Sequence, residues 1–432
     1  MPQSTSSTNS IISSAARRYA MVVLAIVYMF NFVDRQILSI LLPAIRDEFQ
    51  VGDTVLGLLA GTAFALFYVI LGVPIAQLAD RVNRRNLIAA AVAIWSGMTA
   101  LSGLAANIWH LVLARIGVGI GEAGCSPPAH SMIADLYPPE RRSSAMGFYT
   151  LGISAGIMLA YLAGGWVAQN IGWREAFFIV GIPGLLLALV VRFTLTEPRR
   201  GASEQRTDSG EPPNLLLVTT FLLARRSFLY MAIAAGLSAF VGYAIINFMP
   251  SFIVRSFNME VAVLGFWLGL IYGIAGGFGF FMGGYFADHF GQHNHQRALA
   301  FIGLAQAMSA ILFATVFLAP TVMWCLILLV VPTVTSNFYL APVLSQTQSL
   351  VSLRMRAVAS SLVLLIINVI GLAMGPPVTG LISDVLEPGF GDESMRYSLL
   401  IVSALLLPAA AWCYYQAGRS IDADLQRADE HD

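Results

Sequence analysis

Residues 72–85 read GVPIAQLADRVNRR, and residues 279–294 read GFFMGGYFADHFGQHN. In both stretches an apolar run gives way to a polar loop, and Asp80 and Asp288 hold the same place in the two copies, 208 positions apart. A second pair recurs at nearly this separation, because the proline of Leu-Leu-Pro at 41–43 is matched by that of Phe-Met-Pro at 248–250. An internal repeat of this length predicts two parallel bundles of helices with a substrate site between them.

The composition places this repeat in a lipid bilayer. The 432 residues are 57% hydrophobic and only 11% charged, whereas soluble domains carry about 25% charged residues. A water-soluble enzyme is thereby excluded. Basic and acidic residues balance at 24 each, so no net field favours nucleic acid as a partner. The three cysteines lie far apart, and we expect no enzymatic activity, no metal and no cofactor.

The apolar runs predict twelve membrane-spanning helices, six in each half of the chain. Each run is close to the about 20 residues that a helix needs to cross a bilayer. Helices are favoured over barrel strands because the runs do not alternate and each segment must satisfy its own backbone groups. The expected spans lie near 19–42, 54–79, 87–106, 109–132, 144–168, 174–195, 228–252, 262–287, 298–318, 321–347, 357–383 and 396–416.

Five segments follow from these spans. We expect a disordered cytoplasmic N-tail, an N-terminal six-helix bundle, a cytoplasmic linker, a C-terminal six-helix bundle and a cytoplasmic C-tail, at 1–18, 19–195, 196–227, 228–418 and 419–432. With both termini inside, 18 of the 24 arginines fall on the cytoplasmic side and four outside, as the positive-inside rule requires. The sequence thus predicts a multi-pass protein of the plasma (inner) membrane, expected to be a monomer in the bilayer.

Four ionisable residues lie inside the predicted spans: Asp34 and Arg35 in the first, Arg115 and Glu122 in the fourth. A charge at the centre of a span costs about 2.5–3.5 kcal/mol on insertion scales, so we expect these residues either to form ion pairs or to have a function in transport. Arg115 and Glu122 are two turns apart on one helix face, and the first span brings its pair to an intermediate depth. We expect all four to converge on one wet cavity where a carboxylate carries a proton and an arginine binds an anionic substrate. A static ion-pair network is the alternative.

The second half of the chain offers neutral polar groups in the matching places. Asn247 in the seventh span and Asn337 and Tyr339 in the tenth are candidate substrate-binding residues, with ordinary interhelical hydrogen bonding as the alternative. A cavity that is charged on one wall and mostly apolar on the other suits an amphiphilic substrate.

The loop after the second span carries a candidate cytoplasmic gate. Its charged residues could pair with the loop between the fourth and fifth spans and hold one access state closed; a solvated loop that only sets topology is the alternative. The candidate gate residues are Asp80, Arg81, Arg84, Arg85 and, in the second repeat, Asp288.

Two motifs resemble the major facilitator superfamily. Residues 76–85 are similar to its loop signature G-x-x-x-D-R-x-G-R-R, with Ala76 and Asn83 in place of the glycines, and Arg115–Gly121 matches its signature R-x-x-x-G-x-G. The resemblance implies the major facilitator fold, an all-α membrane protein of twelve transmembrane helices in two pseudo-symmetric six-helix bundles.

Within that superfamily, Asn31–Arg35 and Gly119–Ala123 resemble the Spinster family of lysolipid and sphingolipid transporters. The resemblance implies proton-coupled secondary active transport of lysophospholipids or related anionic or zwitterionic amphiphiles by rocker-switch alternating access. Asp34 and Glu122 would be the proton-coupling pair, and Arg35 and Arg115 would bind the phosphate headgroup, with protons as the coupling ion. The Asp-Arg pair also occurs in proton-coupled symporters of small organic anions such as sugar acids, so such a symporter remains an alternative. A non-coupled lipid transporter or sensor is a further alternative.

Overall fold

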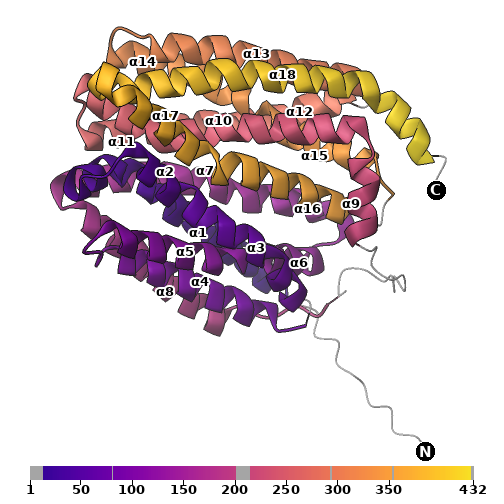
Figure 1. Cartoon of the computed structure of the whole chain (residues 1–432). Coiled ribbons are helices and arrows are strands. Elements are labelled where there is room, and N and C mark those ends of the chain that lie inside the picture. The colour runs from indigo at the N-terminus through magenta and orange to yellow at the C-terminus, as the bar shows by residue number, and fades with distance from the viewer. Residues whose placement is uncertain (1–12, 80, 201–214, 292–293, 353–354, 430–432) are drawn as a thin grey trace, which may run out of the picture.

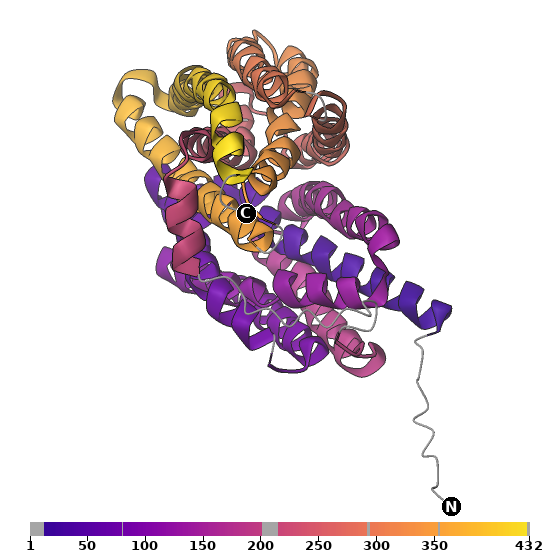
Figure 2. The ribbon, with the colours of Figure 1, turned by 90° about the vertical axis from the view of Figure 1, so that its right-hand side faces the viewer.

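The computed structural model describes residues 13–79, 81–200, 215–291, 294–352 and 355–429. Within these ranges the chain is helical with short connections and contains no strand. Figures 1 and 2 show two bundles of roughly parallel helices, one built from each half of the chain. We call the end of the bundles that carries both chain termini the termini side and the other end the opposite side (Figure 1).

The N-terminal bundle contains eight helices within the described residues. They are α1 (Ser14–Phe49), α2 (Asp53–Ala60), α3 (Thr62–Ala79), α4 (Arg84–Ser102), α5 (Ile108–Ala123), α6 (Ser126–Leu136), α7 (Pro139–Asn170) and α8 (Trp173–Thr194). Two pairs, α2 with α3 and α5 with α6, each form one broken crossing. Pro127 and Pro128 lie in the first turn of α6, and the first turn of a helix tolerates proline.

The C-terminal half follows the same plan. Its helices are α9 (Leu215–Leu223), α10 (Arg226–Phe257), α11 (Val261–Leu270), η1 (Ile271–Ala275), α12 (Gly276–Gly291), α13 (His295–Phe317), α14 (Val322–Ser336), η2 (Asn337–Tyr339), α15 (Leu340–Ser349), α16 (Arg356–Ile366), η3 (Ile367–Ala373), α17 (Gly375–Phe390), η4 (Gly391–Glu393) and α18 (Ser394–Asp429). The first long helices of the two halves end alike, because Gln50 closes α1 and Asn258 closes α10 in the left-handed conformation, 208 positions apart.

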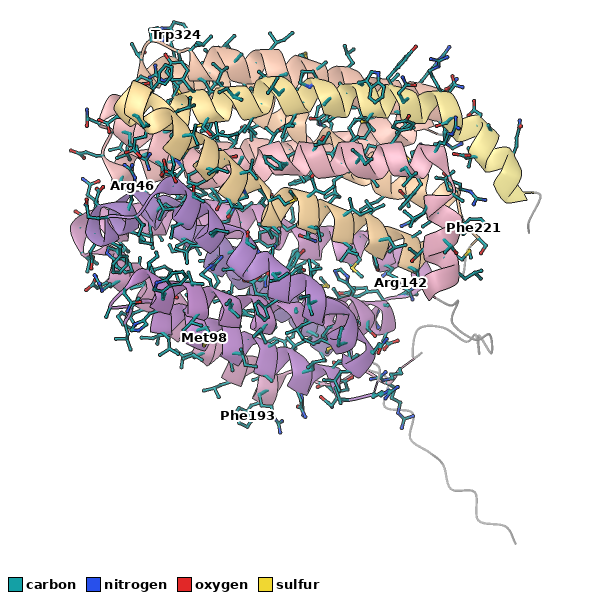
Figure 3. All side chains as sticks on the ribbon, viewed as in Figure 1. Arg46, Met98, Arg142, Phe193, Phe221 and Trp324 are labelled. Carbon is teal, nitrogen blue, oxygen red and sulfur yellow. The ribbon has the colours of Figure 1, made fainter. Side chains whose placement is uncertain are left out.

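The predicted all-α fold is confirmed. Ten helical stretches of the described chain are long and apolar enough to cross a membrane. One of them, Val358–Gln426, holds both the α16–α17 crossing and α18, and the more polar α4 supplies another, so the described residues form twelve crossings. The outward faces suit lipid, since Phe193 is 73% and Trp324 54% exposed (Figure 3).

The helices extend beyond the expected segment boundaries. A tail was expected up to residue 18, but α1 begins at Ser14, where the Ser13 hydroxyl accepts from the backbone N–H of Ala16. A tail was also expected from residue 419, but α18 continues to Asp429, and Asp424 accepts from the Ser227 N–H and hydroxyl at the start of α10. The expected linker contains α9 at Leu215–Leu223. Polar residues that suggested tails therefore serve as helix caps and helix ends.

On the opposite side the two bundles are packed backbone to backbone. A Cβ atom added at Gly57 of α2 would collide with the backbone of Pro376 in α17, and one added at Gly380 would collide with the backbone of Asp53. Glycines at these positions let α2 and α17 approach closely. The structure is therefore closed between the bundles on the opposite side.

Candidate functional site

The four intramembrane charges come together where α1 meets α5. Arg35 donates from Nη2 to Glu122 Oε2 at 2.5 Å and from Nε to the same oxygen at 3.1 Å. Glu122 is fully buried, and its second oxygen has no hydrogen-bond partner among the described residues. Arg35 and Glu122 thus form a closed, charge-assisted pair.

The other two members of the cluster are buried and make no hydrogen bond to a side chain of the described residues. Both carboxylate oxygens of Asp34 lack a hydrogen bond within the described structure, although its side chain is fully buried. Arg115, 2% exposed, donates from Nη1 to the backbone carbonyl of Asp34 at 3.2 Å, while its Nε and Nη2 have no partner in the described chain. The cluster therefore contains one closed pair, Arg35–Glu122, and one open pair, Asp34 and Arg115.

The convergence that the sequence predicted is present, and the four side chains are enclosed by the surrounding helices in this conformation. The side-chain exposure of Arg35 is 11%, and the other three residues are almost completely buried. Thr99 and Trp95 of α4 neighbour Asp34, and the hydroxyl of Thr99 and the indole N–H of Trp95 also make no hydrogen bond among the described residues. The site thus keeps unused hydrogen-bonding capacity around Asp34.

The three neutral candidates of the C-terminal half make different kinds of contact. Asn247 accepts from the Ser39 hydroxyl of α1 at 2.7 Å and donates to the Tyr243 carbonyl. Asn337 donates to the Thr333 carbonyl one turn earlier, and Tyr339 is 9% exposed within an apolar cluster of the C-terminal bundle. Asn247 thus joins the bundles, and substrate binding by all three stays a prediction.

The candidate gate ties the N-terminal bundle to the start of the linker. Arg84 is buried and donates to Asp135 at 2.5 Å, to Glu197 at 2.7 Å and to the Pro198 carbonyl. The backbone N–H of Arg85 also donates to Glu197, whereas Arg81 is exposed.

Two candidate gate residues have no described side chain. Asp80 lies outside the described residues, and so does the side chain of Asp288. The contacts described at Arg84 and Arg85 remain within the first half and the linker, so a gate between the bundles stays a prediction.

Sequence reasoning missed a set of polar contacts on the opposite side, which we call the seam lock: Asp53, Arg255 and Asp384. Arg255 of α10 binds the fully buried Asp53 of α2 through two hydrogen bonds, at 2.5 and 2.7 Å. Asp384 of α17 accepts from the backbone N–H groups of Asp53 and Thr54 at 2.7 and 2.8 Å, capping α2 from the other bundle. Each bundle thus supplies a carboxylate that accepts hydrogen bonds from the other bundle.

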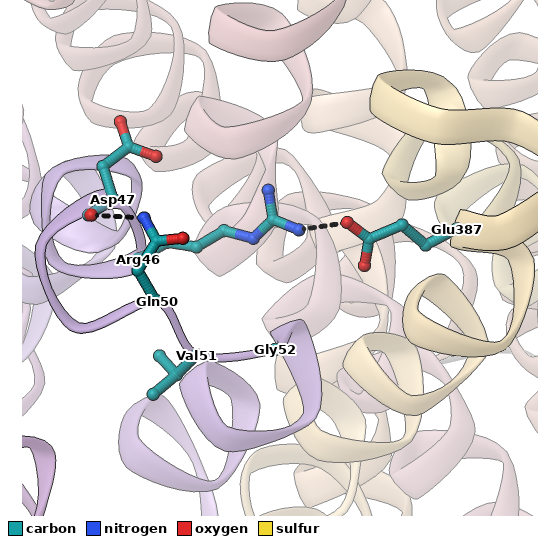
Figure 4. Close-up of a pocket in the computed structure, with 6 residues that line it drawn as sticks. All are labelled: Arg46, Asp47, Gln50, Val51, Gly52 and Glu387. Atoms are coloured by element: carbon teal, nitrogen blue, oxygen red, sulfur yellow. Dashed lines mark hydrogen bonds and ion pairs between the residues drawn. The ribbon is translucent and has the colours of Figure 1, made fainter.

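A more exposed ion pair lies beside the seam lock. Figure 4 shows a polar hollow in which Arg46 of α1 donates to Glu387 of α17 at 2.7 Å. The Glu387 side chain is 45% exposed, so water screens this pair more than it screens Asp53 and Arg255. No local signal reveals these pairs, because Arg255 is 202 positions from Asp53 and Glu387 is 341 from Arg46.

The fold is that of the major facilitator transporters. Residues 24–376 match the family model of the Major Facilitator Superfamily, and the chain belongs to this superfamily. Within it the chain is homologous to the Spinster proteins. A crystal structure of a bacterial homolog of the human lysosomal transporter Spinster, in an inward-facing and unoccupied conformation, superposes with a TM-score of 0.89 and 31% identity, covering 95% of this chain and 99% of that one.

Two curated relatives support this placement. An MFS-type efflux pump of Mycolicibacterium smegmatis is 31% identical over 407 residues, which is 93% of each protein. Protein spinster homolog 1 of Homo sapiens is 31% identical over 246 residues, covering 55% of this chain and 46% of that protein. The match therefore spans about half the length of the human relative.

Proposed function

We propose that the protein is a proton-coupled secondary active transporter of lysophospholipids or related anionic or zwitterionic amphiphiles, working by rocker-switch alternating access. One observation carries this proposal: the buried cluster holds a closed Arg35–Glu122 pair beside an open Asp34 and Arg115. A static ion-pair network would be expected to pair both arginines, because an unpaired buried charge is costly.

The open pair supplies the proton and the anion site. A buried carboxylate without hydrogen bonds is far more stable when neutral, so Asp34 is suited to carry a proton in this conformation. The unused N–H groups of Arg115 are suited to a phosphate headgroup. If Asp34 lost its proton, its carboxylate would compete with the headgroup for Arg115.

The closed pair adds a second link between ligand and proton. A headgroup that draws Arg35 away from Glu122 leaves that carboxylate without its cation, and a carboxylate without a cation is more readily protonated. The headgroup and the proton are therefore bound together. The ligand is therefore expected to bind more tightly as the pH falls, because ligand binding increases the number of protons bound to the protein.

Alternating access requires the seam lock to break. We propose that both termini are cytoplasmic, which the arginine distribution supports, and that the protein is a monomer in the inner membrane with no cofactor. The seam-locked side then faces outward, and the conformation is inward-facing, like that of the similar bacterial structure. Opening outward separates α2 from α17 and Asp53 from Arg255.

Replacing Arg255 by alanine is expected to shift the protein toward the outward-open state. Removing one partner of a buried ion pair costs about 3–5 kcal/mol, and this cost falls only on the state in which Asp53 is buried against α10. Spin labels at Ala106→Cys and Leu318→Cys, both exposed and each at the opposite-side end of its bundle, would report the distance between the two bundles there. The three native cysteines are buried and would not be labelled.

The matched control for this prediction is Glu387→Gln, which breaks the exposed pair with Arg46 but leaves Asp53 with its arginine partners, and it is expected to change the distance distribution far less. An unchanged distribution in Arg255→Ala would show that the seam lock does not set the conformational balance.

Transport into proteoliposomes tests the proposed function. Purified protein in vesicles with an imposed pH gradient is expected to accumulate lysophosphatidylglycerol across the membrane, and to stop when the gradient is collapsed. Lipid flux that ignores the gradient would favour a non-coupled lipid transporter. Gradient-driven uptake of glucuronate, unaffected by lysolipid, would favour the organic-anion symporter and overturn the proposal.

A further inference from the structure

Three aromatic rings surround the guanidinium group of Arg35. The Arg35 Cζ lies 5.0 Å from the ring centroid of Phe32, 4.7 Å from that of Phe64 and 5.2 Å from that of Tyr68. All three distances are within the about 6 Å range of a cation–π interaction. These rings come from α1 and α3, so two helices contribute to holding Arg35.

Phe64 differs from the other two rings because it contacts both arginines. The Cζ of Arg115 lies 5.3 Å from the Phe64 centroid. The Phe64 side chain is fully buried, and in a dry site a cation–π contact is stronger than in water. A single ring therefore stabilises two like charges that would otherwise repel each other.

The backbone explains why Phe64 reaches both arginines. A Cβ at Gly119 would collide with the Phe64 carbonyl oxygen, so α3 lies directly against α5 at this glycine. Gly119 stands four residues after Arg115 and three before Glu122, and residues at these spacings share one helix face. The close approach at Gly119 thus sets Phe64 between the two charged residues of α5.

We propose that Phe64 is a positioning residue whose ring holds Arg35 and Arg115 together for one anionic headgroup. The inference rests on the proposed function and deepens it by naming the ring that holds the two positively charged arginines close together. Other titratable and polar groups that face the cluster are Tyr28, Asn31 and Asp34 of α1, Tyr68 of α3, Trp95 and Thr99 of α4, Glu122 of α5, Cys125 after it and Tyr243 of α10.

Binding of short-chain lysophosphatidylglycerol at pH 6 and pH 8 tests this role. The phosphodiester keeps one negative charge over this range, so a pH dependence of the Kd reports on the protein. Phe64→Leu is expected to weaken binding roughly tenfold and to reduce the ratio of the two Kd values. Phe64→Tyr, which keeps the ring, is expected to restore both. Tyr68→Leu, which removes a ring that contacts Arg35, is expected to show a smaller loss.

Phe177→Leu is the matched control, because Phe177 is also buried in the N-terminal bundle and packs on Trp173. It is expected to bind with the Kd and pH dependence of the wild type. Wild-type binding and pH dependence in Phe64→Leu, or an equal loss in Phe177→Leu, would overturn the positioning role. Absence of pH dependence in the wild type would instead count against the proposed function.

A ligand-free measurement separates the two proposals further. We expect thermal unfolding of Phe64→Leu, Arg115→Met and the double variant to be non-additive, because Phe64→Leu costs less once the second guanidinium is gone. Additive losses would show that Phe64 acts only through packing, whatever the substrate is.

Discussion

Arg115→Ala is expected to abolish measurable binding of lysophosphatidylglycerol while leaving the protein folded. Its unused Nε and Nη2 are the donors that the proposed headgroup would occupy. Charge-assisted hydrogen bonds in a dry site contribute about 1.5–3 kcal/mol each, so losing two weakens binding by at least about 100-fold. The fold loses the hydrogen bond of this side chain to the Asp34 carbonyl and its contact with the Phe64 ring, and removal of a buried charge that has no ion-pair partner offsets part of this loss.

Isothermal titration together with thermal unfolding checks this prediction. The control is Arg192→Ala, since Arg192 is exposed near the end of α8, beside Phe193 and away from the cluster. It is expected to bind as the wild type does. Normal binding by Arg115→Ala would remove the headgroup role of this arginine.

Glu122→Gln is expected to uncouple transport from the pH gradient. The amide resembles the protonated acid in shape but cannot exchange a proton, and it holds Arg35 more weakly than the carboxylate does. Arg35 is then available to the headgroup at every pH, so the Kd of Glu122→Gln should lose much of its pH dependence. Gradient-driven accumulation in proteoliposomes is expected to fall by more than about tenfold, as when a group that acts on protons is removed.

Glu48→Gln is the matched control for this variant. Glu48 is a partly exposed carboxylate that pairs with Arg174 at the end of α1, away from the cluster. It is expected to accumulate lysolipid normally. If Glu122→Gln also accumulates lysolipid in response to the gradient, Glu122 does not take part in coupling.

The charge cluster could be predicted from the sequence because its members are conspicuous there. Ionisable residues inside apolar spans are costly, and the spacing of Arg115 and Glu122 put both on one helix face. The sequence did not reveal which carboxylate is paired. In the structure the Arg35 guanidinium lies among the rings of Phe32, Phe64 and Tyr68 and pairs with Glu122, and aromatic residues in an apolar span give no local signal of such an arrangement.

The seam lock could not be predicted for a different reason. Asp53 and Arg255 lie near helix ends, where charged residues are common and usually solvated, and Asp384 lies six residues before the end of α17. Their burial depends on how α2 and α17 approach each other, and this approach depends on Gly57 and Gly380 meeting backbone in the other helix. The contact between Asp53 and Asp384, 331 positions apart, follows from the packing of the bundles, which local sequence patterns do not specify.

Proton exchange during ligand binding shows whether a headgroup and protons bind together at the cluster of Asp34, Arg35, Arg115 and Glu122. Lysophosphatidylglycerol would be added to purified protein in weakly buffered solution while the pH is recorded. We expect net proton uptake that saturates with binding and disappears in the double variant Asp34→Asn/Glu122→Gln. Saturable binding with no proton uptake at any pH between 5 and 8 would contradict it.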